Sequence, residues 1–287
     1  PCFNADKYLS LTLKAVFDQT YPIDEVLIID DGSIDDTAKI AASFPVRVIR
    51  HGCNKGLAAA RNTAFRAARN DIVASLDADC VAEKDWLIKL IKKFTQNNVG
   101  GVGGRLVERY GVSIMDQWRM RHMLQHWGDQ ENDAPAFLFG SNTIFRKKTV
   151  LGVGGYNEIF WSNYEDVDLS KKICLTGEKL IYYPDARVEH YRQDTVLSLL
   201  KSYWLWHYAV SFSCSRVEDM WREFYTYEKC FLGLGVRYIR QDIGDKLYKF
   251  LLMDFLTIIY CCSRVCWDIF LRIFRLWSKR LNHVSCG

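Results

Sequence analysis

The segment VLIIDDGSIDDT, residues 26–37, joins four apolar residues directly to an aspartate-rich turn. Residues 26–29 predict a short buried strand in a parallel sheet, because they include β-branched residues, show no polar alternation and are bounded by turn formers. In open α/β sheets, ligands bind beyond the carboxyl ends of the strands. We therefore expect Asp30 and Asp31 at a ligand-binding edge, although a turn-forming role also explains Asp30.

Helix and strand patterns alternate through about residue 100. Asp35 and Asp36 are interpreted as turn and N-cap residues of the helix that follows the first strand. The segments in chain order are a helix at 7–19, a strand at 26–29, a helix at 36–43, a strand at 46–50, an Ala-rich helix after GCNKG, and the strand in DIVASLDADC. This alternation predicts an α/β domain with a doubly wound, mostly parallel sheet flanked by helices.

A second pair of acidic residues, Asp77 and Asp79, flanks Ala78 at the end of a later strand. Carboxylates at positions i and i+2 of a turning chain can face one site, which suits a hard divalent cation that is also held by phosphate oxygens. Aspartate is also common at strand exits for local reasons. The order of the motifs favours the metal site, because it would place both acidic pairs along one sheet edge.

The composition is that of an ordinary globular protein, with 287 residues, 49% of them hydrophobic and 25% charged. It excludes a disordered chain. The ten cysteines lack metal-ligand spacing, and a disulfide framework would be unusual at this length, so a reducing compartment is expected.

Residues 191–287 contain 14 Lys and Arg against 9 Asp and Glu, a surplus of five positive charges. Bulky apolar residues are interleaved with them, which favours a membrane surface over nucleic acid as the partner.

The chain has a helical and aromatic pattern from about residue 195 to its end. Between residues 250 and 277 polar side chains recur every three, four or seven positions and leave a broad apolar face. The longest charge-free run, residues 255–263, is too short to span a bilayer, which takes about 20 apolar residues. The pattern predicts interfacial membrane binding or, alternatively, a helix packed in a dimer or a C-terminal bundle.

Five motifs occur in the order typical of one enzyme family. They are PCFN at 1–4, DDGS at 30–33, NKGLAAARN at 54–62, DAD at 77–79, and GSNTIFRKKTVLGVGGYNEIFWSNYEDVDL at 140–169. From Pro1 to about His190 the chain resembles the family 2 nucleotide-sugar glycosyltransferases, which have the GT-A fold. In that family a strand leads into the PCFN-like motif, so we expect a first strand, and any targeting signal, to be missing before Pro1.

The resemblance implies a donor site. Asp31 corresponds to an aspartate that hydrogen-bonds the pyrimidine ring, and Asp79 to a direct ligand of a Mg²⁺ or Mn²⁺ ion that also binds the diphosphate. His190 is expected to help bind the metal or the diphosphate, or else to be a packed histidine. The other residues expected to bind the nucleotide sugar are Pro1, Phe3, Asn4, Gly56, Arg61, Asp77, which lies nearer the ribose, and Ala78.

The resemblance also implies the acid–base chemistry. Sugar transfer passes through an oxocarbenium-like transition state, in which a carboxylate removes the proton of the acceptor hydroxyl while the diphosphate leaves. Asp166 corresponds to this base and Glu165 to a residue that positions the base or the acceptor; we interpret Asp168 as a helix-start residue. His122 and His126 have the i, i+4 spacing of a metal site, but with no acidic third ligand near them in sequence we expect them on an acceptor-facing surface.

Together these features imply an inverting, metal-dependent, hexosyltransferase-like enzyme of glycan, glycolipid or cell-surface polysaccharide assembly. The expected donor is a UDP or dTDP sugar, and the expected acceptor a glycan or a lipid-linked sugar. A nucleotidyltransferase and a non-catalytic nucleotide-sugar or glycan-binding protein of the same fold stay open as alternatives. We expect residues 1–192 to form the catalytic domain, and residues 193–287 a helical extension that binds the cytoplasmic face of the membrane or joins a homodimer.

Overall fold

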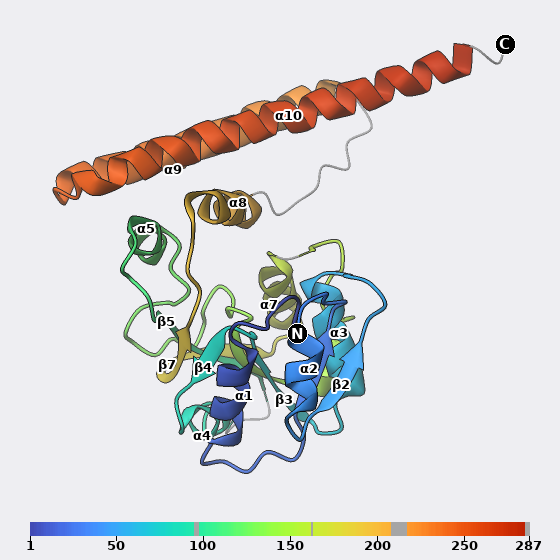
Figure 1. Cartoon of the computed structure of the whole chain (residues 1–287), viewed down its shortest axis with the longest axis vertical. Coiled ribbons are helices and arrows are strands. Elements are labelled where there is room, and N and C mark those ends of the chain that lie inside the picture. Colours follow the sequence, from blue (N-terminus) through green and yellow to red (C-terminus); the bar gives the residue numbers. More distant parts are fainter. Residues whose placement is uncertain (95–97, 162, 208–216, 285–287) are drawn as a thin grey trace. The chain divides into compact units, whose positions relative to one another are not determined.

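The computed structural model describes residues 1–94, 98–161, 163–207 and 217–284 (Figure 1). The chain divides into two compact units. The first unit consists of Pro1–Tyr110 and Leu124–Gln193, and the second of Gly111–Met123 and Asp194–Gly287. Residues 111–123, which the sequence placed in the first domain, therefore belong to the second unit.

The first unit contains two sheets. β1 (Leu27–Asp30) and β2 (Arg47–Arg50) form a parallel pair. The second sheet has the order β3-β6-β5-β7-β4, in which β5 and β7 are parallel and the other three pairs are antiparallel. Its strands are β3 Ile72–Leu76, β4 Cys80–Ala82, β5 Val99–Glu108, β6 Asn142–Arg146 and β7 Lys179–His190. The α/β class is confirmed. The larger sheet is mixed and not mostly parallel, because an apolar run carries no information about strand direction.

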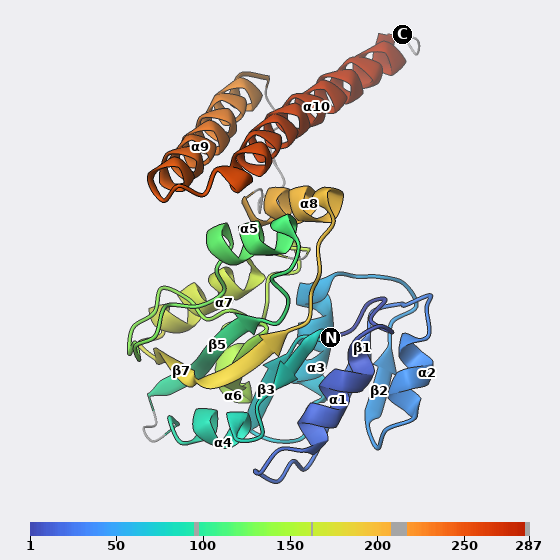
Figure 2. The ribbon, with the colours of Figure 1, turned by 60° about the vertical axis from the view of Figure 1, so that its left-hand side comes forward.

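Helices cover both faces of the larger sheet (Figure 2). Ile144 and Phe145 are neighbours on β6 and belong to different hydrophobic clusters, as the alternation of side chains along a strand requires. One cluster is shared with α4 and the other with α3 and α7. The helices of this unit are α1 Leu9–Phe17, α2 Thr37–Ala42, α3 Leu57–Ala67, α4 Trp86–Ile91, α6 Lys147–Gly152 and α7 Glu165–Leu175.

The turn after β1 is held by aspartate side chains. Asp30 is fully buried, and its Oδ1 accepts a hydrogen bond from the Ser33 N–H at 2.9 Å. Asp36 occupies the N-cap position of α2 but makes no capping hydrogen bond through its side chain. Asp35 provides this bond instead, since its Oδ1 accepts from the Thr37 N–H at 3.0 Å. Asp36 therefore has the expected N-cap position without the capping bond, and Asp35 has the expected turn role, because an aspartate can close a turn onto the N–H two positions later.

A largely apolar cavity of ≈ 430 Å³ lies between β1 and β3. Residues 26–28 line it on one side and residues 72–76 on the other. Each of these strands has one paired neighbour within its sheet, β2 for β1 and β6 for β3. Cys2 makes a parallel bridge to the end of β1, since its N–H donates to the Ile29 carbonyl at 2.8 Å. The cavity therefore lies between one edge of β1 and one edge of β3, and in the described sheets neither edge is paired with another strand.

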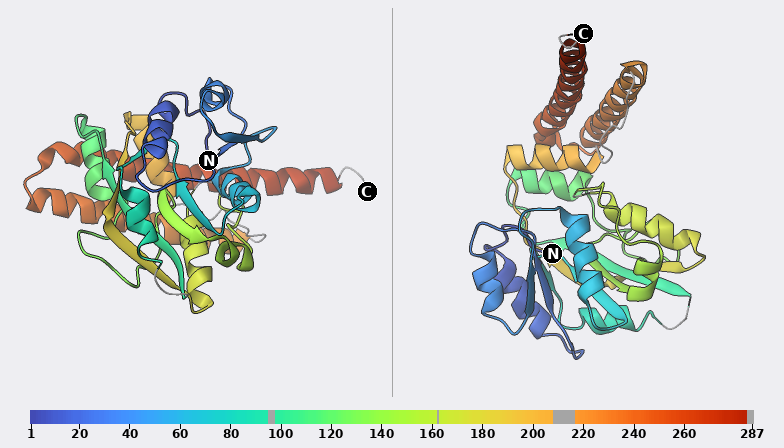
Figure 3. Two further views of the ribbon diagram at one scale, coloured as in Figure 1. Left: turned by 90° about the horizontal axis from the view of Figure 1, so that it is seen from below. Right: turned by 90° about the vertical axis from the view of Figure 1, so that its right-hand side faces the viewer.

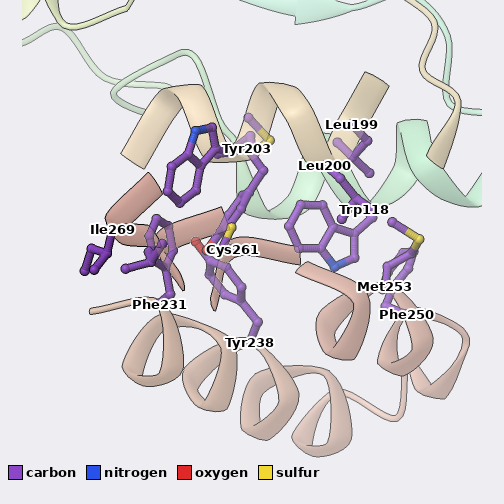
Figure 4. Packing of buried hydrophobic residues seen from close by; sticks show 13 residues of the cluster. Trp118, Leu199, Leu200, Tyr203, Phe231, Tyr238, Phe250, Met253, Cys261 and Ile269 are labelled. Atoms are coloured by element: carbon purple, nitrogen blue, oxygen red, sulfur yellow. The ribbon is translucent and has the colours of Figure 1, made fainter. Parts of the chain in front are cut away.

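The second unit is helical. It consists of α5 (Ile114–His122), α8 (Val196–His207), α9 (Val217–Gly244) and α10 (Leu251–Val284), and α9 and α10 form a hairpin joined at Tyr248–Phe250 (Figure 3). Trp118 of α5 is fully buried among apolar side chains of the other helices. Its neighbours in the cluster include Leu199, Tyr203, Tyr238, Phe250 and Met253 (Figure 4).

α10 is apolar on two opposite faces. One face is buried and includes Met253, Cys261 and Val265. The other face is exposed and includes the side chains that we call the α10 stripe, namely Leu252, Phe255, Ile259, Trp267 and Phe270. By length and composition, Tyr248–Leu271 could cross a membrane, with a mean hydropathy of 1.5 over its best window. The charge-free run of residues 255–263 is short, but the helix that contains it passes this test, as core helices of soluble proteins also do.

Candidate active site

Residues of all five motifs line one cavity of ≈ 410 Å³ in the first unit. Of the side chains expected to bind nucleotide sugar or metal, those in its wall are Pro1, Phe3, Asn4, Asp31, Gly56, Asp77, Ala78 and Asp79. β1 and β3 belong to different sheets, so these residues face a common cavity and do not follow a single sheet edge. The wall does not include Arg61, Glu165, Asp166 or His190.

Asp31 organises the loop that precedes α3. Its Oδ1 is 2.6 Å from His51 Nδ1 and accepts from the Lys55 N–H at 2.9 Å. Its Oδ2 accepts from the Gly56 N–H at 2.8 Å. A carboxylate offers about four acceptor positions. These three contacts leave room for one further donor, such as the N–H of a pyrimidine ring, while the carboxylate also fixes the loop.

Two backbone conformations shape this wall. Gly56 has φ +93°, and a Cβ there would lie 2.7 Å from the Trp161 carbonyl oxygen, so only glycine fits without rearrangement. Asn4 has φ +48°, and its Oδ1 accepts from the Ile34 N–H at 3.0 Å. The Asn4 side chain therefore ties the PCFN motif to the DDGS turn, in addition to lining the cavity.

The DAD motif joins the cavity to β7. Asp79 Oδ2 lies 3.2 Å from His190 Nε2, and the Nδ1 of the same ring lies 3.0 Å from Glu108 Oε1. Burial disfavours the charged imidazole, but hydrogen bonds and charges from Asp79 and Glu108 outweigh burial and raise the pKa of His190 to about 9. Burial likewise opposes ionisation of Asp79, yet the hydrogen bond and charge of His190 hold its pKa below the usual value. Asp79 is therefore an anion whose side chain is still 35% exposed at the cavity.

These residues fit a hard divalent cation. Ligand atoms of Asp79, Cys80 and His190 lie within 4.8 Å of one another. Burial raises the pKa of the Cys80 thiol well above its ordinary value, so it stays protonated and is a poor ligand. The remaining donors are the Asp79 carboxylate and the His190 imidazole, and oxygen-rich sets completed by phosphate suit Mg²⁺ or Mn²⁺. An ion bound by His190 Nε2 would take the place of the proton on that nitrogen.

The buried Arg61 side chain bridges two carboxylates. Arg61 lies on α3, and its side chain is 2% exposed. Nη2 donates to Asp77 Oδ1 at 3.0 Å, and Nη1 donates to Glu165 Oε1 at 2.6 Å. Gly140 packs directly on the guanidinium, since a Cβ there would lie 2.3 Å from Nη1. Arg61 therefore joins the DAD motif to the start of α7. Its contact with the nucleotide stays a prediction.

The expected base and its neighbour lie at the first turn of α7. Asp166 Oδ2 accepts from the Gly140 N–H at 3.0 Å, and Oδ1 accepts from the Val167 N–H at 2.8 Å. Burial raises the pKa of Asp166, although Arg61 and these hydrogen bonds oppose the shift. Burial raises the pKa of Glu165 to about 7, also against the charge of Arg61. Asp168 pairs with Lys172 at 2.7 Å.

Three residues of the site were not predicted from the sequence. His51 holds Asp31, Glu108 holds His190, and Trp161 forms part of the cavity wall. Glu108 had a usable signal, since it is an acidic residue at the end of a strand, as Asp30 is. The pairing of His51 with Asp31 had no signal in the sequence.

Replacing Arg61 with methionine should lower the free energy of unfolding by about 3–5 kcal/mol, because it leaves the buried Glu165 carboxylate without its charged partner. Urea unfolding followed by circular dichroism measures the change. Arg66→Met is the matched control on the same helix, since the Arg66 side chain is 63% exposed, and it should cost less than about 0.5 kcal/mol. Equal free energies of unfolding for the two variants would contradict a stabilising role of the Arg61 bridge.

Comparison with known proteins places these motifs in a family. The family model described as "Glycosyl transferase family 2" matches residues 1–153. The pre-mycofactocin glycosyltransferase of Mycobacterium tuberculosis is 30% identical over 174 residues, which cover 58% of this chain and 37% of that protein. The glucosyl-dolichyl phosphate glucuronosyltransferase of Haloferax volcanii is 26% identical over 243 residues, covering 70% of this chain and 72% of that protein. The chain thus spans little more than a third of the length of the first relative.

Solved structures share the fold. The mannosyltransferase PcManGT from Pyrobaculum calidifontis, in complex with GDP-Man and Mn²⁺, has a TM-score of 0.61 at 18% identity and covers 93% of this chain and 86% of that one. TarS of S. aureus has a TM-score of 0.55 at 17% identity, covering 71% of this chain and 38% of that one. At these identities the likeness shows the fold alone.

Proposed function

The chain belongs to glycosyl transferase family 2, and from that membership we propose that it transfers a hexose from a nucleoside-diphosphate sugar to a hydroxyl group, with inversion. The observation that carries the proposal is the single cavity lined by Asp31, Gly56, Asp77 and Asp79. A glycan or lipid-linked acceptor in glycolipid or polysaccharide assembly is the proposed second substrate. The test is hydrolysis of the donor by the purified chain, in which water takes the place of the acceptor hydroxyl and receives the sugar while the nucleoside diphosphate leaves.

The donor is proposed to bind with its base near Asp31 and its diphosphate near Asp79. The free acceptor position on Asp31 supports recognition of a pyrimidine N–H, hence a UDP or dTDP sugar. TarS has been solved in complex with UDP and with UDP-GlcNAc, and PcManGT with GDP-Man, which supports a nucleotide sugar as the ligand class. Asp77, held by Arg61, would contact the ribose.

A Mg²⁺ or Mn²⁺ ion is proposed at Asp79, with His190 as the second protein ligand. When bound, such an ion supplies Lewis-acid stabilisation of the charge on the leaving diphosphate. Glu108 would orient His190 through Nδ1, as carboxylates commonly do for metal-bound histidines. The Mn²⁺ in the PcManGT complex supports an ion of this kind.

Asp166 is proposed as the general base for the acceptor hydroxyl. Its two backbone hydrogen bonds fix the carboxylate, and its raised pKa gives it the basicity that proton abstraction near neutral pH requires. Glu165, held by Arg61, is proposed to position the turn that carries Asp166.

The nucleotidyltransferase and binding-protein alternatives predict different products. A nucleotidyltransferase joins a sugar phosphate to a nucleotide and releases pyrophosphate, so it would not release nucleoside diphosphate. A binding protein would retain the donor uncleaved. Asp31, Asp79 and Asp166 are all present, which supports the transferase.

We also propose that the α10 stripe binds the cytoplasmic face of a membrane. The stripe is exposed and apolar, and residues 191–287 carry a surplus of five positive charges, which suits an anionic lipid surface. Surface binding is favoured over spanning because the opposite face of α10 is buried in the helical unit and includes the fully buried Asp254.

Replacing Phe255, Ile259 and Phe270 together by glutamate should weaken binding to anionic phospholipid vesicles at least about 10-fold, because it removes apolar contact and adds repulsive charge. Vesicle co-sedimentation measures the binding. A matched triple variant at the exposed Leu11, Leu151 and Leu175 of the first unit should bind as the unmodified chain does. If the stripe variant binds vesicles normally, or if it instead converts a dimer to a monomer in light scattering, the membrane assignment fails.

An extended segment joined to Pro1 is proposed to fill the 430 Å³ cavity. The proposal is supported by the two strand edges that flank the cavity and by its apolar lining. Adding six residues rich in Val and Ile before Pro1 should raise Tm by about 5 °C or more, since each buried Val or Ile contributes about 1.5–3 kcal/mol. A Gly-Ser segment of the same length is the control. Identical Tm values for the two extensions would overturn the proposal.

A further inference from the structure

The second unit contains a buried cluster of potential metal ligands. His122 of α5, Asp242 of α9 and Asp254 of α10 each offer a ligand atom, and these atoms lie within 4.8 Å of one another. Asp242 and Asp254 are 0% exposed, and the His122 side chain is 1% exposed. Three helices therefore bring one imidazole and two carboxylates to a point that water does not reach.

The contacts of the cluster leave one oxygen unused. Asp242 Oδ1 is 2.5 Å from Arg121 Nε, and Asp242 Oδ2 is 3.0 Å from His122 Nε2. Asp254 Oδ1 accepts from the indole N–H of Trp118 at 2.8 Å. Asp254 Oδ2 is buried and accepts no hydrogen bond from the residues that the structure describes. A buried carboxylate oxygen without a donor is costly, so the geometry calls for a cation at this point.

The side chains around the ligands resemble the outer shell of a metal site. The His122 ring lies between aromatic rings, with centroids 4.9 Å from Trp118 and 4.3 Å from Tyr238, so its orientation is fixed. Trp118 holds one oxygen of Asp254 and Arg121 holds one oxygen of Asp242, so the second oxygen of each carboxylate can face the centre. Outer contacts of this kind orient ligands and tune metal affinity.

We propose that His122, Asp242 and Asp254 bind a divalent transition-metal ion that joins α5, α9 and α10. One imidazole with two carboxylates is a donor set that Zn²⁺ and Mn²⁺ accept. The residues differ from those proposed to bind the donor's metal, and the role is structural, because binding connects three helices. His126, which has the i, i+4 spacing of a metal site with His122 but was expected on an acceptor-facing surface, belongs to the first unit, and the acidic ligands come from positions 120 or more residues later in the sequence.

Zinc binding tests the proposal in an Asp79→Ala background, which removes the carboxylate ligand proposed at the other metal site. After treatment with EDTA and dialysis, this chain should retain about one equivalent of added Zn²⁺ by elemental analysis. Its Tm should rise by about 5 °C at Zn²⁺ concentrations about 100-fold above Kd. A further Asp254→Asn change should abolish both effects, whereas Asp268→Asn on the same helix, whose side chain pairs with Arg264, should preserve both.

Two results would overturn the site: no Zn²⁺ retained by the Asp79→Ala chain, or equal retention after Asp254→Asn. A spectroscopic measurement needs no change to the cluster and covers the case in which Asp254→Asn fails to fold. Co²⁺ added to the Asp79→Ala chain should give visible absorption bands stronger than those of aqueous Co²⁺. A spectrum identical to that of aqueous Co²⁺ would overturn the site independently of any cluster variant.

Discussion

Replacing Asp79 with alanine is expected to abolish sugar transfer and to remove the Mn²⁺ dependence of UDP or dTDP binding. Asp79 is the anionic carboxylate of the cavity wall that is paired with His190, so its loss removes the proposed protein anchor of the ion and the diphosphate together. Calorimetric titration with nucleotide, with and without Mn²⁺, measures the binding, and a product assay measures transfer.

Asp85→Ala is the control for this experiment. Asp85 also follows a short strand of the same unit, but its side chain is 50% exposed and pairs with Lys89 on the surface. It should leave transfer and Mn²⁺ dependence unchanged. The metal assignment would be wrong if Mn²⁺ still tightened nucleotide binding in the Asp79→Ala chain.

The second large effect is expected at Asp166. Asp166→Asn should lower kcat by about 100- to 10,000-fold, the usual contribution of a positioned general base. Donor affinity should hardly change, because Asp166 lies outside the wall of the donor cavity. Since burial raises the pKa of Asp166, kcat of the unmodified chain should fall as acidification protonates this carboxylate, at a pH above the ordinary aspartate range, and the variant should lose this limb of the pH profile.

Asp168→Asn provides the matched comparison. Asp168 lies on the same first turn of α7, but it pairs with Lys172 and should be replaceable with little loss of kcat. Donor binding and turnover must come from one protein preparation, so that misfolding is not mistaken for lost catalysis. Normal turnover in the Asp166→Asn chain would refute the base, and joint loss of donor binding and turnover would make Asp166 a structural residue.

The elements around the cavity could largely be predicted from sequence. β1, α3 and β3 lie within or next to the predicted segments, because buried apolar runs and glycine-punctuated helix starts are local signals. The sequence also predicted that Asp31, Asp77 and Asp79 would lie near one another, and they share one cavity wall. It did not predict the separate two-stranded sheet, because strand pairing depends on the long-range path of the chain.

Contacts between side chains that are far apart in the sequence could not be predicted from local sequence patterns. Arg61 and Glu165 are 104 residues apart in the sequence. Because a charged side chain near a ligand site can equally well contact the ligand, the sequence offered no reason to pair these two with each other. His122 likewise meets Asp242 across 120 residues, whereas its sequence neighbour His126 belongs to the other unit. Such partners are set by tertiary packing and leave no periodicity in the sequence.

Donor hydrolysis by the purified chain with Mn²⁺ tests directly whether this chain cleaves a nucleotide sugar, with water as the acceptor. UDP and dTDP sugars are incubated with the unmodified, Asp79→Ala and Asp85→Ala chains, and the products are separated by ion-exchange chromatography. We expect release of nucleoside diphosphate by the unmodified and Asp85→Ala chains and none by the Asp79→Ala chain. Recovery of every donor intact, or release at the same rate by the Asp79→Ala chain, would contradict it.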